Sequence, residues 1–227
     1  MVQESVDYFN RDHLLQPVKI RLAMRARRRM YQRVLDLARP NESATVLDVG
    51  TTPDLTLPYN NCFERWYPHT NHVVACSIED CSNLEQYFPG LRFIRLTGER
   101  LPFPDGHFDF ATSFAVLEHV GSRENQERLL SELARVSREF IAYTPYRYFP
   151  IEMHTFWPFV HWLPRRWHRK LWRACGQAFW AEESNLHLLS VQEVRSILPK
   201  TGVARVRLLR TLLFPSNIEI HWCAVSK

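Results

Sequence analysis

The regular alternation of short apolar runs with helix-like segments constrains the fold of this chain most strongly. Five apolar runs predict strands at 45–49, 72–78, 91–96, 108–113 and 140–144. Helical patterns precede or separate them at 14–38, 58–67, 82–88 and 122–137. Because strands that alternate with helices form a parallel sheet covered on both faces, the sequence predicts an α/β fold with a Rossmann-like, doubly wound sheet.

The last part of the chain follows a different pattern. Two β-rich runs, Val203–Leu213 and Ile218–Val225, are joined by Phe-Pro-Ser-Asn at 214–217. Such a junction indicates a hairpin, so a mostly parallel, seven-stranded sheet should contain one antiparallel strand. Between Pro145 and about Ser190 we expect an aromatic-rich helical insertion.

Length and composition fit one such domain. The 227 residues, 45% of them hydrophobic, can form one α/β core with an insertion. The N-terminal stretch MVQESVDYFNRDHLLQP lacks the apolar run of a secretory signal, and no stretch reaches the ~18 apolar residues of a membrane span. Five cysteines without paired spacing indicate reduced thiols, so we expect a cytoplasmic protein.

The net charge of +5 is concentrated in two basic stretches without acids, at 18–33 and 165–173. Their members are Lys19, Arg21, Arg25, Arg27, Arg28, Arg29 and Arg33, and Arg165, Arg166, Arg169, Lys170 and Arg173. Either stretch could contact phosphate, lipid headgroups or nucleic acid. A solvated helix face is the equally weighted alternative.

The run VLDVG at 46–50 ends on an acid and a glycine, which is typical of the strand that opens a nucleotide site. The loop that follows, Thr-Thr-Pro-Asp at 51–54, contains no glycine. A bound pyrophosphate requires the G-x-G-x-x-G turn, so a nicotinamide-dependent dehydrogenase is not expected. A ligand without phosphate could still lie against Gly50, where the missing side chain allows a tight turn.

Three stretches resemble class I S-adenosylmethionine-dependent methyltransferases. VLDVG is similar to the first motif of that family. The stretch ERLPFPDGHFDFATSFAVLEHV and its continuation, residues 99–145, resemble the third motif through strand five in the ubiquinone-biosynthesis-like, or type 11, branch. TPYRYFPIEMHTFWPFVHWLP, residues 144–164, resembles a bacterial subgroup with the motif TPxRxFPIExHT. The resemblance implies S-adenosylmethionine as cofactor and S-adenosylhomocysteine as product.

The resemblance also implies where the cofactor lies. In an open parallel sheet, ligands bind beyond the carboxyl ends of the strands, where the strand order reverses. Asp48 would hold the ammonium group or loop amides by charge-assisted hydrogen bonds, beside Gly50 and Thr51. The ring of Phe114 would face the sulfonium or the adenine. The alternatives are a loop-capping role for Asp48 and an ordinary core position for Phe114.

Two positions depart from the family pattern. Where the family carries an acid for the ribose hydroxyls, this chain has Ser77, followed by Ile78 and Glu79. Because residues two apart on a strand share a face, Glu79 could replace that acid. Where the family carries an aspartate for the adenine amino group, this chain has Thr97, followed by Gly98 and Glu99. Both changes predict weaker cofactor binding or a rearranged pocket.

Two carboxylate–histidine pairs are candidates for catalysis on the acceptor side. Glu118 and His119 follow the fourth strand, and Glu152 and His154 follow the fifth. Either imidazole could remove a proton from the acceptor near neutral pH. The alternative is a structural role, closing a loop or lining the pocket. The expected substrate contacts are Tyr146, Arg147 and Trp157.

The insertion carries five of the seven tryptophans, interleaved with basic residues: Trp157, Trp162, Trp167, Trp172 and Trp180. It could be a lid that excludes water from the acceptor, a segment at a membrane surface or a stacking surface for nucleic-acid bases. A cap that simply packs on the sheet is the alternative. His154, His161 and His168 are seven apart, but intervening prolines break any continuous helix, so no metal site is expected.

These features predict a single methyltransferase domain. Its parts are an N-terminal helical segment (1–43), a cofactor-binding core (44–145), an acceptor-side cap (146–190) and a C-terminal helix with a hairpin (191–227). The expected acceptor is a small molecule, a glycan or a lipid-linked compound, methylated at a hydroxyl. The expected partners include a membrane surface at the cap. A non-catalytic partner protein with a degenerate pocket is the alternative. A nucleic-acid methyltransferase is a weaker one, because no nucleic-acid module is present.

Overall fold

The computed structural model describes residues 16–98, 100–211 and 213–225. Within these residues the strands form one sheet in the order β3-β2-β1-β4-β5-β7-β6. The strands are β1 (Val46–Val49), β2 (Val73–Ser77), β3 (Arg92–Arg95), β4 (Phe110–Phe114), β5 (Glu139–Pro145), β6 (Val203–Thr211) and β7 (Phe214–Cys223). The helices are α1 (Gln16–Ala38), α2 (Cys62–Trp66), α3 (Asn83–Tyr87), α4 (Arg123–Val136), α5 (Arg165–Ala174), α6 (Ala178–Ala181) and α7 (Val191–Ser196). Short 3-10 turns lie at Thr70–His72, Leu117–His119 and Val160–Trp162.

The expected doubly wound sheet is confirmed. β1 to β5 pair in parallel, and β7 runs antiparallel between β5 and β6. The one antiparallel strand therefore makes two antiparallel pairings. The strand order reverses between β1 and β4, which is where ligands of such sheets bind.

The predicted position of the hairpin turn is wrong. β6 ends at Thr211 and β7 already begins at Phe214, so the residues 214–217 belong to the strand. Pro215 stands opposite Arg210, where the register shifts and one extra residue is accommodated. A bulge at a sheet end tolerates a proline that cannot donate to the ladder, and this is why the proline did not mark the turn.

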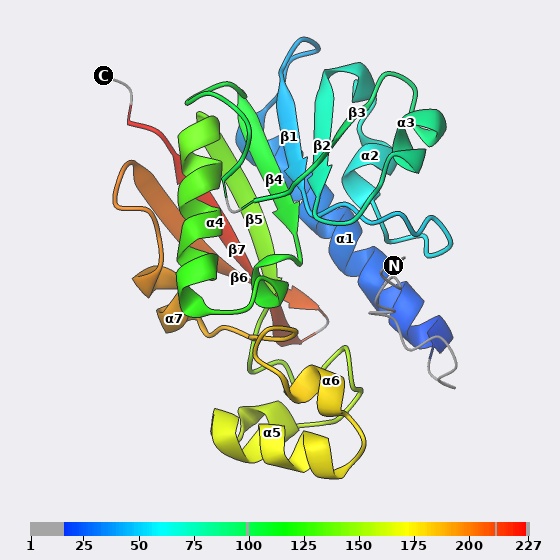
Figure 1. Ribbon diagram of the computed structural model, residues 1–227, viewed down its shortest axis with the longest axis vertical. Helices are drawn as coiled ribbons and strands as arrows, with labels where there is room; N and C mark the ends of the chain where they lie inside the picture. The colour runs from blue at the N-terminus through cyan, green and yellow to red at the C-terminus, as the bar shows by residue number, and fades with distance from the viewer. Residues whose placement is uncertain (1–15, 99, 212, 226–227) are drawn as a thin grey trace.

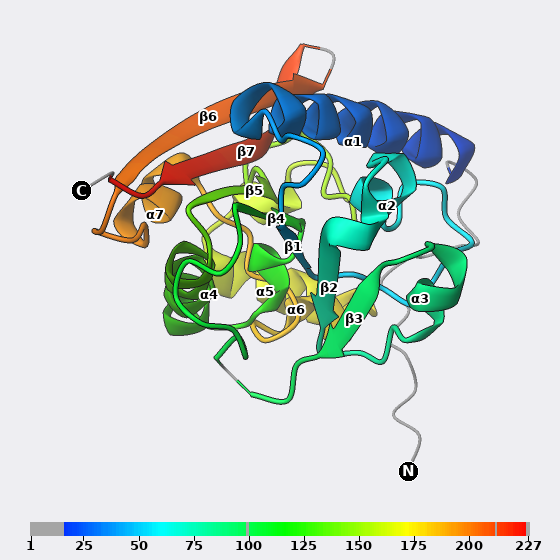
Figure 2. The same ribbon diagram turned by 90° about the horizontal axis from the view of Figure 1, so that it is seen from above.

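Helices cover both faces of the sheet (Figures 1 and 2). On one face, Met30 and Val34 of α1 pack with Phe63 of α2 against buried strand residues. On the other face, Leu130 and Leu133 of α4 lie in a second core with α7 and β7. The long N-terminal helix predicted from periodicity is therefore an integral layer of the domain over its described residues.

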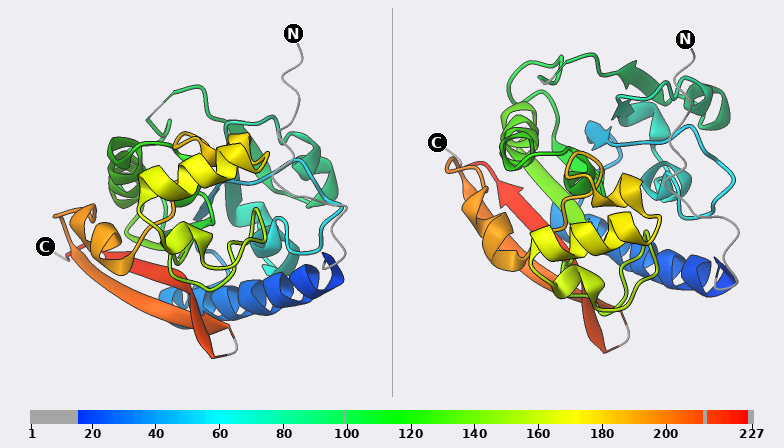
Figure 3. Two further views of the ribbon diagram at one scale, coloured as in Figure 1. Left: turned by 90° about the horizontal axis from the view of Figure 1, so that it is seen from below. Right: turned by 60° about the horizontal axis from the view of Figure 1, so that its bottom comes forward.

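The insertion forms a small helical cap at one end of the molecule, where α5 and α6 lie in front when viewed from below (Figure 3). Its own core contains Trp172 and Trp180. In contrast, Trp162 and Trp167 are among the exposed large apolar side chains. Two of the five tryptophans of the insertion therefore pack inside the cap, and two lie on its surface.

Candidate functional site

Gly50 determines the shape of the turn after β1. Its φ is +104°, and a Cβ built there would lie 2.0 Å from Cγ2 of Val116 in the loop after β4. Its amide donates to the carbonyl of Cys76 on β2, at 2.8 Å. Only glycine tolerates both this backbone angle and this close contact, so Gly50 lets the loops that follow β1 and β4 lie against each other.

The loop 51–54 is fixed by the side chains of two asparagines. The side chain of Asn61 donates to the carbonyl of Thr52 at 2.8 Å and accepts from its amide at 3.0 Å. Asn60 donates to the carbonyl of Asp54 at 3.1 Å. Asn61 adopts a left-handed conformation with φ 49°, so α2 begins only at Cys62 rather than near residue 58. These amide bonds replace the glycine-rich turn as the element that fixes the loop.

A cavity of about 620 Å³ lies beside this loop. That volume falls within the range of about 300–1,000 Å³ that is typical of small-molecule sites. The predicted cofactor residues that line it are Asp48, Gly50, Thr51, Ser77, Ile78, Glu79, Gly98 and Phe114. Thr97 is not among the lining residues, and Glu99 lies outside the described residues. The loop without glycines thus leaves room for a ligand.

Asp48 lies at the buried end of the cavity. It accepts a hydrogen bond from the Thr112 hydroxyl of β4, and burial raises the pKa of its carboxyl. Glu64 of α2 is equally buried, and burial followed by the neighbouring charge of Asp48 raises the pKa of Glu64 well above its ordinary value. Of the two carboxyls, Glu64 is the one whose charged form the pair disfavours more. Sequence reasoning missed Glu64, because nothing local places α2 against β1.

Arg27 of α1 also reaches the cavity, and sequence reasoning placed it only in a basic stretch. Its guanidinium carbon lies 5.7 Å from the centroid of the Phe114 ring, which also stacks on Tyr143 at 5.3 Å. One guanidinium nitrogen, Nη1, is buried without a hydrogen-bond partner among the described residues. A cation supplied by the protein thus lies within cation–π distance of Phe114.

Glu152 and His154 form a hydrogen-bonded pair on the acceptor side. The imidazole Nδ1 of His154 lies 2.6 Å from Oε1 of Glu152. The same carboxylate accepts from the amide and the hydroxyl of Thr155, at 2.6 and 2.8 Å. Burial alone would raise the pKa of Glu152, but the charge and hydrogen bonds of His154 and the backbone amides outweigh it and hold the pKa at about 2. Glu152 is therefore ionised at neutral pH and orients His154 through Nδ1.

Glu118 and His119 form the second pair. His119 Nδ1 lies 2.7 Å from the carbonyl of Asn185, which makes Nδ1 the protonated nitrogen. Burial, with the charge of His154, lowers the pKa of His119 to about 3, so this imidazole is neutral. Glu118 is fully buried, accepts from the Thr144 hydroxyl at 2.8 Å, and has its pKa raised by burial.

The two pairs meet at one wall of the cavity. The rings of His119 and His154 contact edge to face, with centroids 5.0 Å apart, and Trp180 of the cap lies 4.6 Å from His154. Glu118, His119, Glu152 and His154 all line the cavity together with the cofactor residues. The cap therefore positions the candidate base by aromatic contact.

Of the three predicted substrate residues, only one lines the cavity. Tyr146 lines the cavity, whereas Arg147 donates to the carbonyl of Leu163 at 3.2 Å, and neither Arg147 nor Trp157 is among the lining residues. His161 does line the cavity and was not predicted to do so. Its Nε2 lies 2.7 Å from the carbonyl of Phe149, and its Nδ1 is buried without a partner among the described residues.

One family model matches part of this chain. Residues 47–139, 93 of the 227, match a family model described as a methyltransferase domain. A search of curated protein sequences finds no match to this chain. No helix among the described residues is long and apolar enough to cross a membrane.

Solved structures show the same fold. One is a SAM-dependent methyltransferase from Aquifex aeolicus, with 19% identity and a TM-score of 0.55 over 92% of this chain and 98% of that one. Another is magnesium protoporphyrin IX methyltransferase from Synechocystis with bound SAH, with 15% identity and a TM-score of 0.58 over 93% and 88%. The chain therefore has the fold of S-adenosylmethionine-dependent methyltransferases, and these comparisons support S-adenosylmethionine as its cofactor.

Proposed function

We propose that this protein transfers a methyl group from S-adenosylmethionine to a hydroxyl of a small-molecule, glycan or lipid-linked acceptor. One observation carries the proposal: a single cavity is lined both by the residues beyond β1, β2 and β4 and by two carboxylate–histidine pairs. The proposed cofactor site and a candidate base thus share one cavity. When bound, the sulfonium supplies an activated methyl group.

The residues present fit that cofactor. Asp48 supplies a carboxyl for its ammonium group, and Arg27 supplies a guanidinium nitrogen that lacks a partner among the described residues, suited to its carboxylate. Glu79 lines the cavity beside Ser77 and can accept from ribose hydroxyls. Burial raises the pKa of Glu79, and hydrogen bonds from hydroxyls would favour its ionised form.

His154 is the better of the two candidate bases. With Nδ1–H donated to ionised Glu152, Nε2 becomes the nitrogen that can take the hydroxyl proton, and the carboxylate stabilises the imidazolium that results. His119 is too weakly basic for this role, since its pKa lies at about 3. We assign His119 to positioning the His154 ring and Glu118 to anchoring the loop at Thr144.

The test is methyl transfer to a panel of hydroxylated small molecules, glycans and lipid-linked glycans, read as S-adenosylhomocysteine released. His154→Gln should lose at least ~100-fold in rate while keeping cofactor affinity, as expected for loss of a general base. His168→Gln, a histidine of α5 that does not line the cavity, is the matched control. Full activity in His154→Gln would refute the assigned base. Cofactor binding without transfer to any acceptor would favour the non-catalytic alternative.

The cap supports a membrane surface as the place where the acceptor is met. Phe159, Trp162 and Trp167 are 53%, 42% and 54% exposed. Arg166 and Lys170 each lie 5.7 Å from the Trp167 ring, which joins basic and aromatic groups on one surface of α5. Tryptophan with basic neighbours favours the headgroup region of anionic bilayers. We propose that this surface rests on anionic lipid at the cytoplasmic face of a membrane.

Vesicle sedimentation tests this contact. The protein should sediment with phosphatidylglycerol-containing vesicles and not with neutral phosphatidylcholine vesicles, and Trp162→Ala with Trp167→Ala should weaken binding about tenfold or more. Trp222→Phe, on the buried end of β7, is a control for loss of tryptophan elsewhere. Equal binding of the double variant, or no binding to either vesicle, would contradict the proposal.

A further inference from the structure

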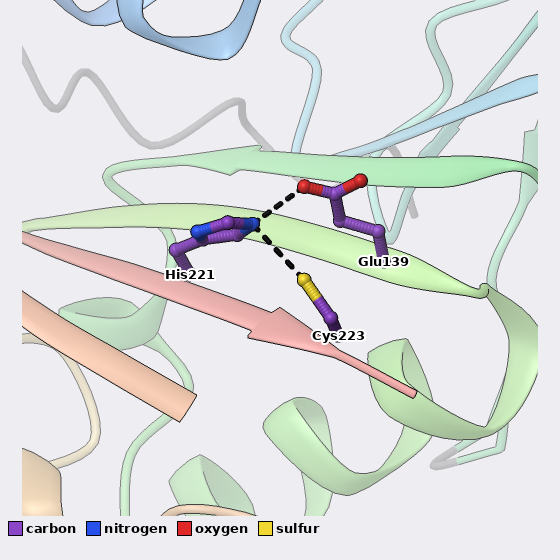
Figure 4. A group of neighbouring side chains, drawn as sticks. All are labelled: Glu139, His221 and Cys223. Carbon is purple, nitrogen blue, oxygen red and sulfur yellow. Dashed lines mark hydrogen bonds and ion pairs between the residues drawn. The ribbon is translucent and has the colours of Figure 1, made fainter. Parts of the chain in front are cut away.

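A second cluster of reactive side chains lies away from the cavity, at the beginning of β5 and the end of β7. Figure 4 shows Glu139 reaching from β5 and His221 and Cys223 reaching from β7. Glu139 stands directly opposite Cys223 in the antiparallel register, and His221 is two residues before Cys223. Because side chains alternate along a strand, the three project from the same face of the sheet. None of the three lines the cavity described above.

The three donor atoms converge closely. His221 Nε2 lies 2.5 Å from Oε1 of Glu139 and 3.2 Å from Sγ of Cys223. One donor atom from each residue lies within 4.8 Å of the other two. Among the described residues, these three side chains form a group of histidine, cysteine and acidic residues whose donor atoms are close enough to hold one metal ion. It combines imidazole, thiol and carboxylate.

We propose that Glu139, His221 and Cys223 bind a divalent transition-metal ion, with zinc as the best fit. Zinc accepts this set of nitrogen, sulfur and oxygen donors at about 2.0–2.3 Å in tetrahedral geometry, which sets donor atoms roughly 3.3–3.6 Å apart. The Nε2–Sγ distance is already close to that spacing, and the Nε2–Oε1 pair needs to open by only about 1 Å.

The surroundings fit a three-ligand site with one position open to solvent. His221 is buried, whereas Glu139 and Cys223 are partly exposed, so an ion can enter from one side. Binding would release the thiol proton and the proton shared by His221 and Glu139, leaving a thiolate and a carboxylate that balance the two positive charges. Arg205 of β6, paired with His221 in the register, is a cationic neighbour whose charge opposes that of the ion.

Cobalt(II) is a spectroscopic probe of such a site. The full chain, stripped with a chelator, should bind one equivalent of Co²⁺ with visible d–d bands of a four-coordinate ion and a thiolate-to-metal charge-transfer band. Zn²⁺ should displace it. Cys223→Ser should abolish the charge-transfer band, and Glu139→Gln should weaken binding about tenfold or more. Cys175→Ser, at an exposed cysteine of the cap, should leave the spectrum unchanged.

A measurement on the unaltered protein keeps the proposal testable if a variant fails to fold. One equivalent of Zn²⁺ should slow alkylation of Cys223 at least tenfold, measured by peptide mass spectrometry, and should not change alkylation of Cys175. The site is refuted if Zn²⁺ leaves Cys223 equally reactive. It is also refuted if Cys223→Ser shows the same cobalt spectrum as the unaltered protein. Neither measurement depends on methyl transfer.

Discussion

Replacing Gly50 with alanine tests the turn on which the cavity depends. The φ of +104° costs an L-residue about 1–3 kcal/mol. The new Cβ would lie 2.0 Å from Cγ2 of Val116, and relieving such overpacking costs about 1–3 kcal/mol more. Together we expect Gly50→Ala to destabilise the protein by about 2–6 kcal/mol, or roughly 4–24 °C in Tm for a chain of this size.

Chemical denaturation of the unaltered protein, three single variants and one double variant separates the two contributions. Gly98→Ala is the matched control, because Gly98 lines the same cavity, has no positive φ and would have no atom within 4 Å of its Cβ. It should change stability by less than about 0.5 kcal/mol. In a Val116→Ala background, Gly50→Ala should keep only the backbone cost of about 1–3 kcal/mol. A Gly50→Ala cost below about 0.5 kcal/mol, or no coupling to Val116, would refute this description of the turn.

Three further predictions follow from single contacts. Because the pKa of Glu152 is held at about 2, below its ordinary 4.5, its stabilising contribution is complete above about pH 4.5 and is lost as pH falls toward 2. Acid denaturation should therefore be less steep between pH 4.5 and 2 in Glu152→Gln than in the unaltered protein, and equal slopes would contradict that pKa. Arg27→Ala should weaken S-adenosylhomocysteine binding about 10–100-fold by calorimetry. Arg28→Ala is the control and should not weaken it, because Arg28 lies over Trp66 instead. Equal effects of the two variants would exclude a contact between Arg27 and the cofactor carboxylate. Arg33→Ala leaves the buried carboxylate of Glu219 without its bidentate partner at 2.7 and 3.0 Å. Denaturation should therefore show a free energy of unfolding that is lower by about 3–5 kcal/mol. A loss below about 1 kcal/mol would show that Glu219 finds another partner.

The positions of the strands were readable from the sequence because that information is local. Buried parallel strands appear as continuous apolar runs, and the run at 46–49 is found where it was predicted. The hairpin turn was misplaced because proline marks a turn and a strand bulge alike, and only the register of β6 against β7 distinguishes them. That residues beyond β1, β2 and β4 line one cavity was predictable from the topology, which brings the carboxyl ends of these strands together.

The parts of the site that escaped prediction depend on contacts between distant segments. Arg27 and Arg33 belong to one basic stretch, yet one faces the cavity and the other pairs with Glu219, 186 residues away. Asn60 and Asn61 fix the loop without glycines through side-chain amides, a solution for which the sequence offers no motif. Residue spacing along a helix identifies which residues share a face, but it does not identify the residues that contact that face in the fold.

Calorimetric titration with S-adenosylhomocysteine tests the central claim most directly. The cavity beyond β1 and β4 should bind one equivalent, and Asp48→Ala should reduce the affinity about tenfold or more while the fold is retained. Saturable one-site binding that depends on Asp48 is the result expected from this structure. Absence of binding by the correctly folded, unaltered protein would contradict it and leave a methyltransferase fold without its cofactor.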